Sequence, residues 1–131
     1  MGTPEPEGAT VAMIDEAEKR LGQRFPDDYR DFLTARNGLA TWFGDVYIAL
    51  YSIDQVVELN EIHGHLSHQP ELIHIGSDGG GEAIAFDFRK HPPVVILVNL
   101  VSIHWSEAIF QAESFDQFMD QRRRGENLRW G

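Results

Sequence analysis

Residues 75–87 read IGSDGGGEAIAFD, and this segment decides the fold. Three consecutive glycines, Gly79–Gly81, separate two short runs that are rich in β-forming residues. Because glycine adopts positive φ without steric cost, the segment predicts a tight hairpin between strands at 72–76 and 82–88. A Gly80→Val substitution should then cost ~1 kcal/mol or more of stability if φ at Gly80 is positive.

The same glycines could instead cradle a ligand, but their neighbours argue against that role. No Gly-x-Gly-x-x-Gly opens a helix here, and no Gly-Lys-Ser/Thr follows at the spacing of a phosphate loop. Glu82 comes directly after the glycines, and its charge would repel a phosphate. Asp78 and Glu82 are also too closely spaced for a calcium loop. We therefore predict a structural role for the segment.

Helix signals and further strands surround this hairpin. The predicted helices begin at Thr10, Pro26, Ser52 and Ser114, and Gly22, Asn37-Gly38 and Gly125 end three of them. Strands are predicted as two pieces within 39–52, then at 72–76, 82–88 and 93–100, and as one straight or bent strand within 101–111. Because strands follow one another without regular alternation with helices, we predict an α+β fold. It is a mostly antiparallel twisted sheet of about five or six strands packed with about four helices.

The apolar spacing predicts which side chains form the core. The inward positions of the helices recur every three or four residues, with Glu18 as a polar break in the first. These positions are Val11, Ile14, Ala17 and Leu21, then Tyr29, Phe32 and Leu33, and finally Phe115, Phe118 and Met119. Strand 94–98 is apolar on both faces and is placed centrally. Trp42 and Trp105 are assigned to the core, and Trp130 to a packing strap or an exposed tail.

Length and composition predict one domain and a cytoplasmic location. The 131 residues suit a single core, with a disordered arm at 1–8 and one domain at 9–131. Cysteine is absent, which excludes disulfides and thiol chemistry. No apolar run is long enough for a membrane span and no secretory signal is visible, so we expect a cytoplasmic location. We expect a monomer or a weak dimer without cofactors.

The distribution of charge is the strongest functional signal from composition. The chain has 11 basic and 21 acidic residues, for a formal net charge of −10. No lysine or arginine occurs between Asn37 and Phe88, a segment that contains eight acidic residues. Nucleic-acid binding is therefore not expected, because it requires a basic patch. The acidic segment would attract a basic protein surface, although acidity can also serve solubility alone.

Metal and nucleophile chemistry are the enzyme-like alternatives. His63, His65 and His68 bring three imidazoles into six residues, but their spacing matches no strong metal motif. We therefore predict a solvated histidine loop without a metal. No Gly-x-Ser-x-Gly element occurs, and Ser102 and His104 are close only in sequence. No set of residues predicts catalysis.

Five motifs in order resemble the SUKH superfamily, between about Ala9 and Arg124. They are I-x-x-x-E-x-x-L-G at 14–22, F-P-x-D-Y-x-x-F-L at 25–33, Asn37-Gly38, the glycine segment at 75–87, and A-x-S-F-x-x-F at 112–118. The superfamily includes fungal cell-wall-assembly regulators and many bacterial immunity proteins. The resemblance implies an α+β domain without conserved catalytic machinery. Bacterial members commonly neutralise a toxin, often a nuclease, that is encoded beside them.

The sequence thus suggests a non-enzymatic immunity protein that neutralises a basic toxin through an acidic surface. The residues expected to bind the partner are Asp45, Glu58, Glu61, Asp78 and Glu82. The alternative is a regulatory or scaffold module that binds an endogenous protein or a small ligand. A partly apolar pocket beside the glycine turn would favour that alternative. A metal-dependent enzyme would need the histidines to converge in space.

Overall fold

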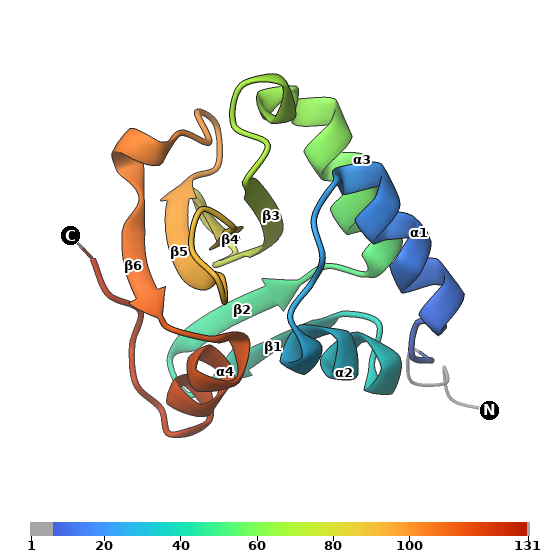
Figure 1. Ribbon diagram of the computed structural model, residues 1–131. Helices are drawn as coiled ribbons and strands as arrows, with labels where there is room; N and C mark the ends of the chain where they lie inside the picture. Colours follow the sequence, from blue (N-terminus) through green and yellow to red (C-terminus); the bar gives the residue numbers. More distant parts are fainter. Residues whose placement is uncertain (1–6, 131) are drawn as a thin grey trace.

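The computed structural model describes residues 7–130, and for His63 it describes the backbone alone. Within these residues, four α-helices pack with one curled six-stranded sheet, as predicted (Figure 1). The helices are α1 (Val11–Leu21), α2 (Asp27–Ala35), α3 (Ile53–His63) and α4 (Phe115–Arg123). The strands are β1 (Leu39–Phe43), β2 (Val46–Leu50), β3 (Leu72–Ser77), β4 (Glu82–Asp87), β5 (Val94–Asn99) and β6 (Ile109–Ala112). Two short 3-10 helices, η1 (His65–Ser67) and η2 (Trp105–Glu107), complete the described elements.

The sheet is an antiparallel meander, in which neighbours along the chain are neighbours in space. Its order is β1-β2-β3-β4-β5-β6, and every adjacent pair runs antiparallel. The predicted hairpin joins the two central strands, β3 and β4. Its positive φ lies at Gly79, with φ of 81°, whereas Gly80 is outside the left-handed region. The Asp78 carboxylate closes the turn by accepting the Gly80 and Glu82 backbone N–H groups at 2.8 and 3.2 Å.

Helix signals in the sequence correspond closely to the helix ends. Thr10 accepts the Met13 backbone N–H, and Ser52 and Gln55 form the complete capping box of α3. Asn37 does more than end α2, since its Oδ1 accepts the Ile53 N–H at 2.8 Å and so also caps α3. Local hydrogen bonding therefore explains why these helices begin where they do.

The main core lies between the helices and one face of the sheet. Its buried apolar side chains include those of Ile14, Tyr29, Leu33 and Phe86. Two predicted inward positions differ: Val11, the first residue of α1, is 58% exposed, and Phe32 is only half-buried.

Glu18 is a structural contact between the first two helices. It accepts the Phe25 backbone N–H at 2.7 Å and the Arg30 guanidinium at 2.6 Å. It therefore holds α1 against the start of α2, which explains the polar break in the apolar stripe of α1. This satisfied carboxylate needs no functional role to account for its position.

A second core lies on the opposite face of β3, β4 and β5. It contains Leu72, Ala83, Ala85, Ile96, Val98 and Ile103. Residues 100–108 fold over this face, so the strand predicted at 101–111 is wrong for all but its last part, Ile109–Ala112. The chain turns at Ile103, which is buried with φ of 43°, an unusual value for a β-branched residue. Apolar residues pack on both faces of β5, as predicted, but the strand lies second from the sheet edge, between β4 and β6, and not at the centre.

The structure corrects the predicted core placement of two tryptophans and shows a buried arginine in α4. Trp42 is 66% exposed, because it lies on the edge strand β1 and packs on Tyr47 with ring centroids 5.3 Å apart. Trp105 is half-buried beneath the Arg89 guanidinium, and Trp130 is exposed. Arg122 is only 2% exposed and lies over the Phe118 ring, so its side chain is part of the packing of α4. Burial lowers the pKa of Arg122 below its ordinary value.

Three buried amide side chains join elements that are distant in sequence. Asn60 of α3 bonds both the N–H and the C=O of His74. Gln69 donates to the Ile103 C=O and accepts the Trp105 N–H, which anchors the segment over the second core. Gln111 likewise bonds the N–H and C=O of Arg129 and holds the C-terminal segment beside β6. In each case the amide side chain forms hydrogen bonds with backbone groups that strand pairing leaves unsatisfied.

The predicted arm at 1–8 falls largely outside the described residues. The described part begins close to the domain, because the Ala9 N–H donates to the Leu33 C=O at 2.7 Å. None of the helices among residues 7–130 has the length and apolarity that crossing a membrane requires.

Candidate functional site

The five acidic residues singled out in the sequence lie on two separate surfaces. Glu58 and Glu61 are on α3, on the side that faces α1. Asp45, Asp78 and Glu82 lie in or beside the β1–β2 and β3–β4 turns. These two turns are neighbours, since β2 pairs antiparallel with β3 and the Tyr47 ring lies against Gly79. We call the second surface, Asp45, Asp78, Glu82 and Glu107, the hairpin end.

Like charges meet at the hairpin end. The pKa of the Glu82 carboxyl is raised above its ordinary value by partial burial, and further by the negative charges of Asp78 and Glu107. Glu107 comes from η2, far along the chain, and accepts the Ser102 hydroxyl at 2.6 Å. The ionised form of Glu82 is therefore disfavoured, and a cation bound close to it would stabilise that form.

Glu82→Gln is expected to stabilise the protein at neutral pH. Because the folded state raises the pKa of Glu82, it binds that proton more tightly than the unfolded state does, and stability falls as the pH rises through the folded pKa. Glutamine avoids this loss, so we expect a gain of roughly 0.5 kcal/mol or less at pH 7. The gain should shrink as the pH falls toward about 4.

Urea denaturation at the two pH values measures this effect. Glu113→Gln, at an exposed position before α4, is the control for removing one negative charge. An equal gain in stability for both variants, or a gain for Glu82→Gln that does not depend on pH, would contradict the explanation by the raised pKa of Glu82.

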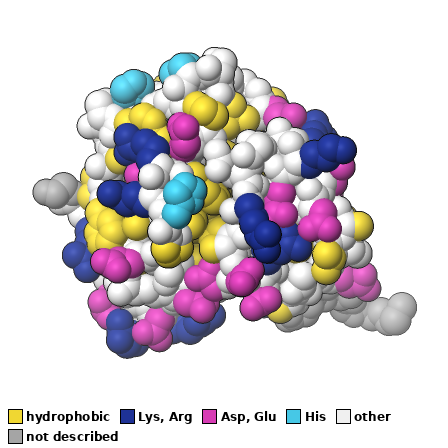
Figure 2. Space-filling view, viewed as in Figure 1, with side chains coloured by type: hydrophobic (Ala, Val, Ile, Leu, Met, Phe, Trp, Pro, Cys, Tyr) yellow, Lys and Arg dark blue, Asp and Glu magenta, His cyan; other side chains and the backbone are white. Residues whose placement is uncertain are grey.

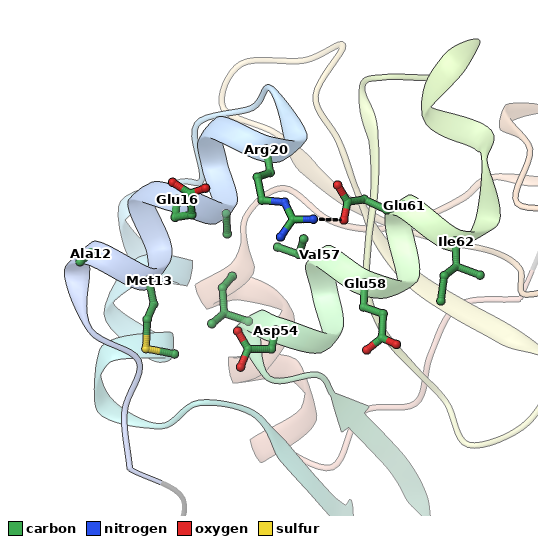
Figure 3. Close-up of a pocket in the computed structure, with 11 residues that line it drawn as sticks. Ala12, Met13, Glu16, Arg20, Asp54, Val57, Glu58, Glu61 and Ile62 are labelled. Carbon is green, nitrogen blue, oxygen red and sulfur yellow. Dashed lines mark hydrogen bonds and ion pairs between the residues drawn. The ribbon is translucent and has the colours of Figure 1, made fainter.

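An open groove between α1 and α3 forms the other surface (Figure 3). Its floor consists of the buried side chains of Ala17, Ile53 and Val57. Ala12, Met13 and Ile62 form its apolar walls, and its volume is about 810 Å³. That volume lies within the ~300–1,000 Å³ range of ligand pockets. The groove does not lie beside the glycine turn, because none of its lining residues comes from the β3–β4 hairpin.

Acidic side chains surround the groove and are largely without cationic partners. Glu16 contributes from α1, and Asp54, Glu58 and Glu61 contribute from α3. Arg20 pairs with Glu61 at 2.5 Å and closes one end, as Figure 3 shows. Within the described residues, no lysine or arginine pairs with Glu16, Asp54 or Glu58. On the face in Figure 2, acidic and basic side chains intermingle, so the excess of acid does not form one continuous patch.

Sequence reasoning missed two of these four carboxylates as candidates. Asp54, Glu58 and Glu61 are spaced i, i+4 and i+7, which places them on one helical face and could have been seen in the sequence. Glu16 joins them only because α1 packs beside α3. The sequence contains no signal for that contact.

Comparison with known families assigns the chain to one of them. The model of the SMI1 / KNR4 family (SUKH-1) matches residues 8–121, a range that contains the groove, the hairpin end and all six strands. The chain belongs to the SUKH-1 family. The resemblance in its motifs is thereby confirmed. The family is known to include immunity proteins, and membership by itself names no toxin.

One relative of this SUKH-1 member is a Bacillus subtilis (strain 168) protein, "Uncharacterized protein YnaB". The two are 37% identical over 54 residues, which are 41% of this chain and 35% of the relative. The match therefore spans about a third of the relative's length.

The histidines of this SUKH-1 member do not share one environment. His65 is buried and its Nε2 lies 2.9 Å from the Leu72 carbonyl oxygen, so the prediction of a solvated loop is wrong for this residue. His68 is exposed, and the side chain of His63 is not among those that the structure describes. Among the described residues, no three His, Asp or Glu side chains gather where they could hold a metal.

The Ser102, His104 and Glu107 side chains also lack the arrangement of a catalytic triad. The Ser102 hydroxyl donates to Glu107, and His104 instead contacts the Ser106 hydroxyl at 2.9 Å. In a triad the serine would bond the histidine, and the histidine would bond the acid. Here the Ser102 hydroxyl bonds the Glu107 carboxylate directly, so these three side chains do not form the relay that activates a catalytic serine.

Proposed function

We propose that this SUKH-1 family member is a non-enzymatic immunity protein that binds and neutralises a basic toxin domain of the nuclease type. The main support for this proposal is the acidic segment Asn37–Phe88, which has no lysine or arginine. Of its eight carboxylates, only those of Glu61 and Asp87 form ion pairs with lysine or arginine among the described residues. The other six are Asp45, Asp54, Glu58, Glu71, Asp78 and Glu82.

Physical chemistry favours such a partner. A nuclease must present cationic groups to the phosphate backbone of its substrate. An acidic protein is steered toward the same groups and, once bound, excludes the nucleic acid from them. Family membership supports this reading, because SUKH-1 proteins include immunity proteins.

Charge reversal tests the proposal on the two acidic surfaces separately. The partner used is the toxin domain encoded beside the gene, in catalytically inactive form. We expect Glu58→Lys/Glu61→Lys or Asp45→Lys/Glu82→Lys to weaken binding at least tenfold at low salt. Close interfacial charge pairs contribute ~1.5–7 kcal/mol, so the effect is measurable by calorimetry. Raising the salt concentration should weaken binding by the unmodified protein.

A matched control is available on a different part of the surface. Asp31 and Glu113 are exposed, and Asp31→Lys/Glu113→Lys makes the same change in net charge. We expect this control to weaken binding much less than the better of the two site variants. No binding by the neighbouring toxin, or binding indifferent to salt and to both site variants, would reject the proposal.

The second candidate function is a regulatory or scaffold module that binds an endogenous protein or a small ligand. The observation in its favour is the groove between α1 and α3, whose floor is apolar and whose size suits a ligand. Recovery of a bound metabolite by mass spectrometry from the purified protein, together with absence of toxin binding, would favour this function over immunity.

A further inference from the structure

We propose that the α1–α3 groove is the docking site for a basic amphipathic helix of the partner protein. The inference rests on the proposed function and deepens it, because it names the surface and the chemistry of the segment that binds there. The groove joins three features that occur together here: an apolar floor, exposed apolar walls and an acidic rim.

The apolar part of the groove remains open to water. Ile62 is 67% exposed on the wall formed by α3, and Ala12 is exposed on the wall formed by α1. The floor beneath consists of Ala17, Ile53 and Val57, and a hollow remains above them between the two helices. Burying such a surface against apolar side chains would contribute favourably to binding.

The charge at the rim selects a cationic occupant. Four carboxylates and one guanidinium line the groove, so its formal charge is −3, from four minus one. Three of the four carboxylates have no cationic partner among the described residues, and the fourth pairs with Arg20. An anionic or purely apolar segment would leave this charge uncompensated as it excluded water, whereas lysine or arginine side chains would pair with it.

The geometry favours a helix over an extended segment. Both walls are α-helices, whose backbone groups are bonded internally, so the groove has no strand edge to which an extended peptide could add. Asp54, Glu58 and Glu61 follow one helical face over about 10 Å. A partner helix with basic residues at the same i, i+4, i+7 spacing, and apolar residues on the adjoining positions, would match both the rim and the floor.

Blocking the groove without changing its charge is the direct test. Ala12 is exposed on the wall of α1, and Ala12→Trp fills the groove, whereas Ala35→Trp makes the same change at an exposed position of α2. The probe is a synthetic helical peptide with lysines at i, i+4 and i+7 and leucines on the adjoining face. A scrambled peptide of the same composition is the control for non-specific attraction to an acidic protein.

Fluorescence anisotropy should show that the ordered peptide binds at least tenfold more tightly than the scrambled one. We expect Ala12→Trp to weaken that binding at least tenfold, and Ala35→Trp to change it less than twofold. Glu58→Gln, at an exposed position, should weaken peptide binding about threefold at low salt. Equal binding of both peptides, or no effect of Ala12→Trp, would overturn the inference.

The toxin experiment separates this inference from the proposed function. If the toxin domain binds but Ala12→Trp leaves its affinity unchanged, the immunity function stands and the groove assignment fails. If the protein forms a concentration-dependent dimer in sedimentation that Ala12→Trp abolishes, the occupant is a second copy and the assignment to a partner helix is wrong. Loss of toxin binding in Ala12→Trp but not in Ala35→Trp would support both the immunity function and the assignment of the groove as the docking site.

Discussion

Gly79→Val is expected to destabilise the protein by roughly 2–4 kcal/mol, because it breaks the hairpin that joins the central strands. Gly79 has φ of 81°, in the region that valine avoids most strongly. A Cβ atom at this position would also lie 2.6 Å from Cδ2 of the Tyr47 ring. Moving that ring would disturb its packing against Trp42, on the neighbouring edge strand.

The adjacent glycine is the matched control. Gly80 lies outside the left-handed region, and a Cβ there would meet only the Asp78 side chain, at 3.4 Å. Gly80→Val should therefore cost less than about 1 kcal/mol, because the positive φ on which the larger expected cost depended lies at Gly79 instead. Guanidinium denaturation of both variants measures the difference. Equal losses, or a larger loss at Gly80, would show that the backbone strain is not at Gly79.

Local signals in the sequence predict most of the fold. The hairpin follows from three glycines between β-forming runs, and the ends of α1 and α3 follow from Thr10 and from Ser52 with Gln55. Each of these signals acts within a few residues of the chain, where composition and spacing are sufficient. The pairing of consecutive strands then follows from short connections, which makes the meander predictable.

The errors occur where contacts between distant segments decide the structure. The segment 101–108 has the apolar content of a strand, but Gln69 binds it at Ile103 and Trp105 and holds it across the second core. Trp42 has the character of a core residue, yet β1 is the edge of the sheet and the side chain is 66% exposed. Neither fact can be read from local periodicity.

The candidate site is likewise only partly predictable from local sequence signals. The excess of acid in Asn37–Phe88 is visible in the sequence, and so is the shared helical face of Asp54, Glu58 and Glu61. The groove itself depends on the packing of α1 beside α3. The sequence therefore predicts the acidic character of the candidate site better than its place in the fold.

Asn60→Leu is expected to destabilise the protein by about 3 kcal/mol or more, although leucine is the better helix former. Asn60 is fully buried on the face of α3 that Ile53 and Val56 also occupy. Its amide nitrogen donates to the His74 carbonyl at 2.7 Å, and its Oδ1 accepts the His74 N–H at 2.9 Å. Leucine would remove both partners from buried backbone groups, at ~1–3 kcal/mol each.

The reason for this cost lies in the incomplete pairing of β2 with β3. That ladder covers only Ala49 and Leu50 opposite Gly76 and Ser77, so at His74 the Asn60 side chain takes the place of a neighbouring strand. Amide hydrogen exchange should therefore accelerate at His74 in the variant more than at Phe86, within the β4 ladder. Asn60→Ala separates the causes: a similar loss in both variants indicates the lost hydrogen bonds, and a loss in Asn60→Leu alone indicates overpacking. Unchanged stability in both would contradict a structural role for the amide.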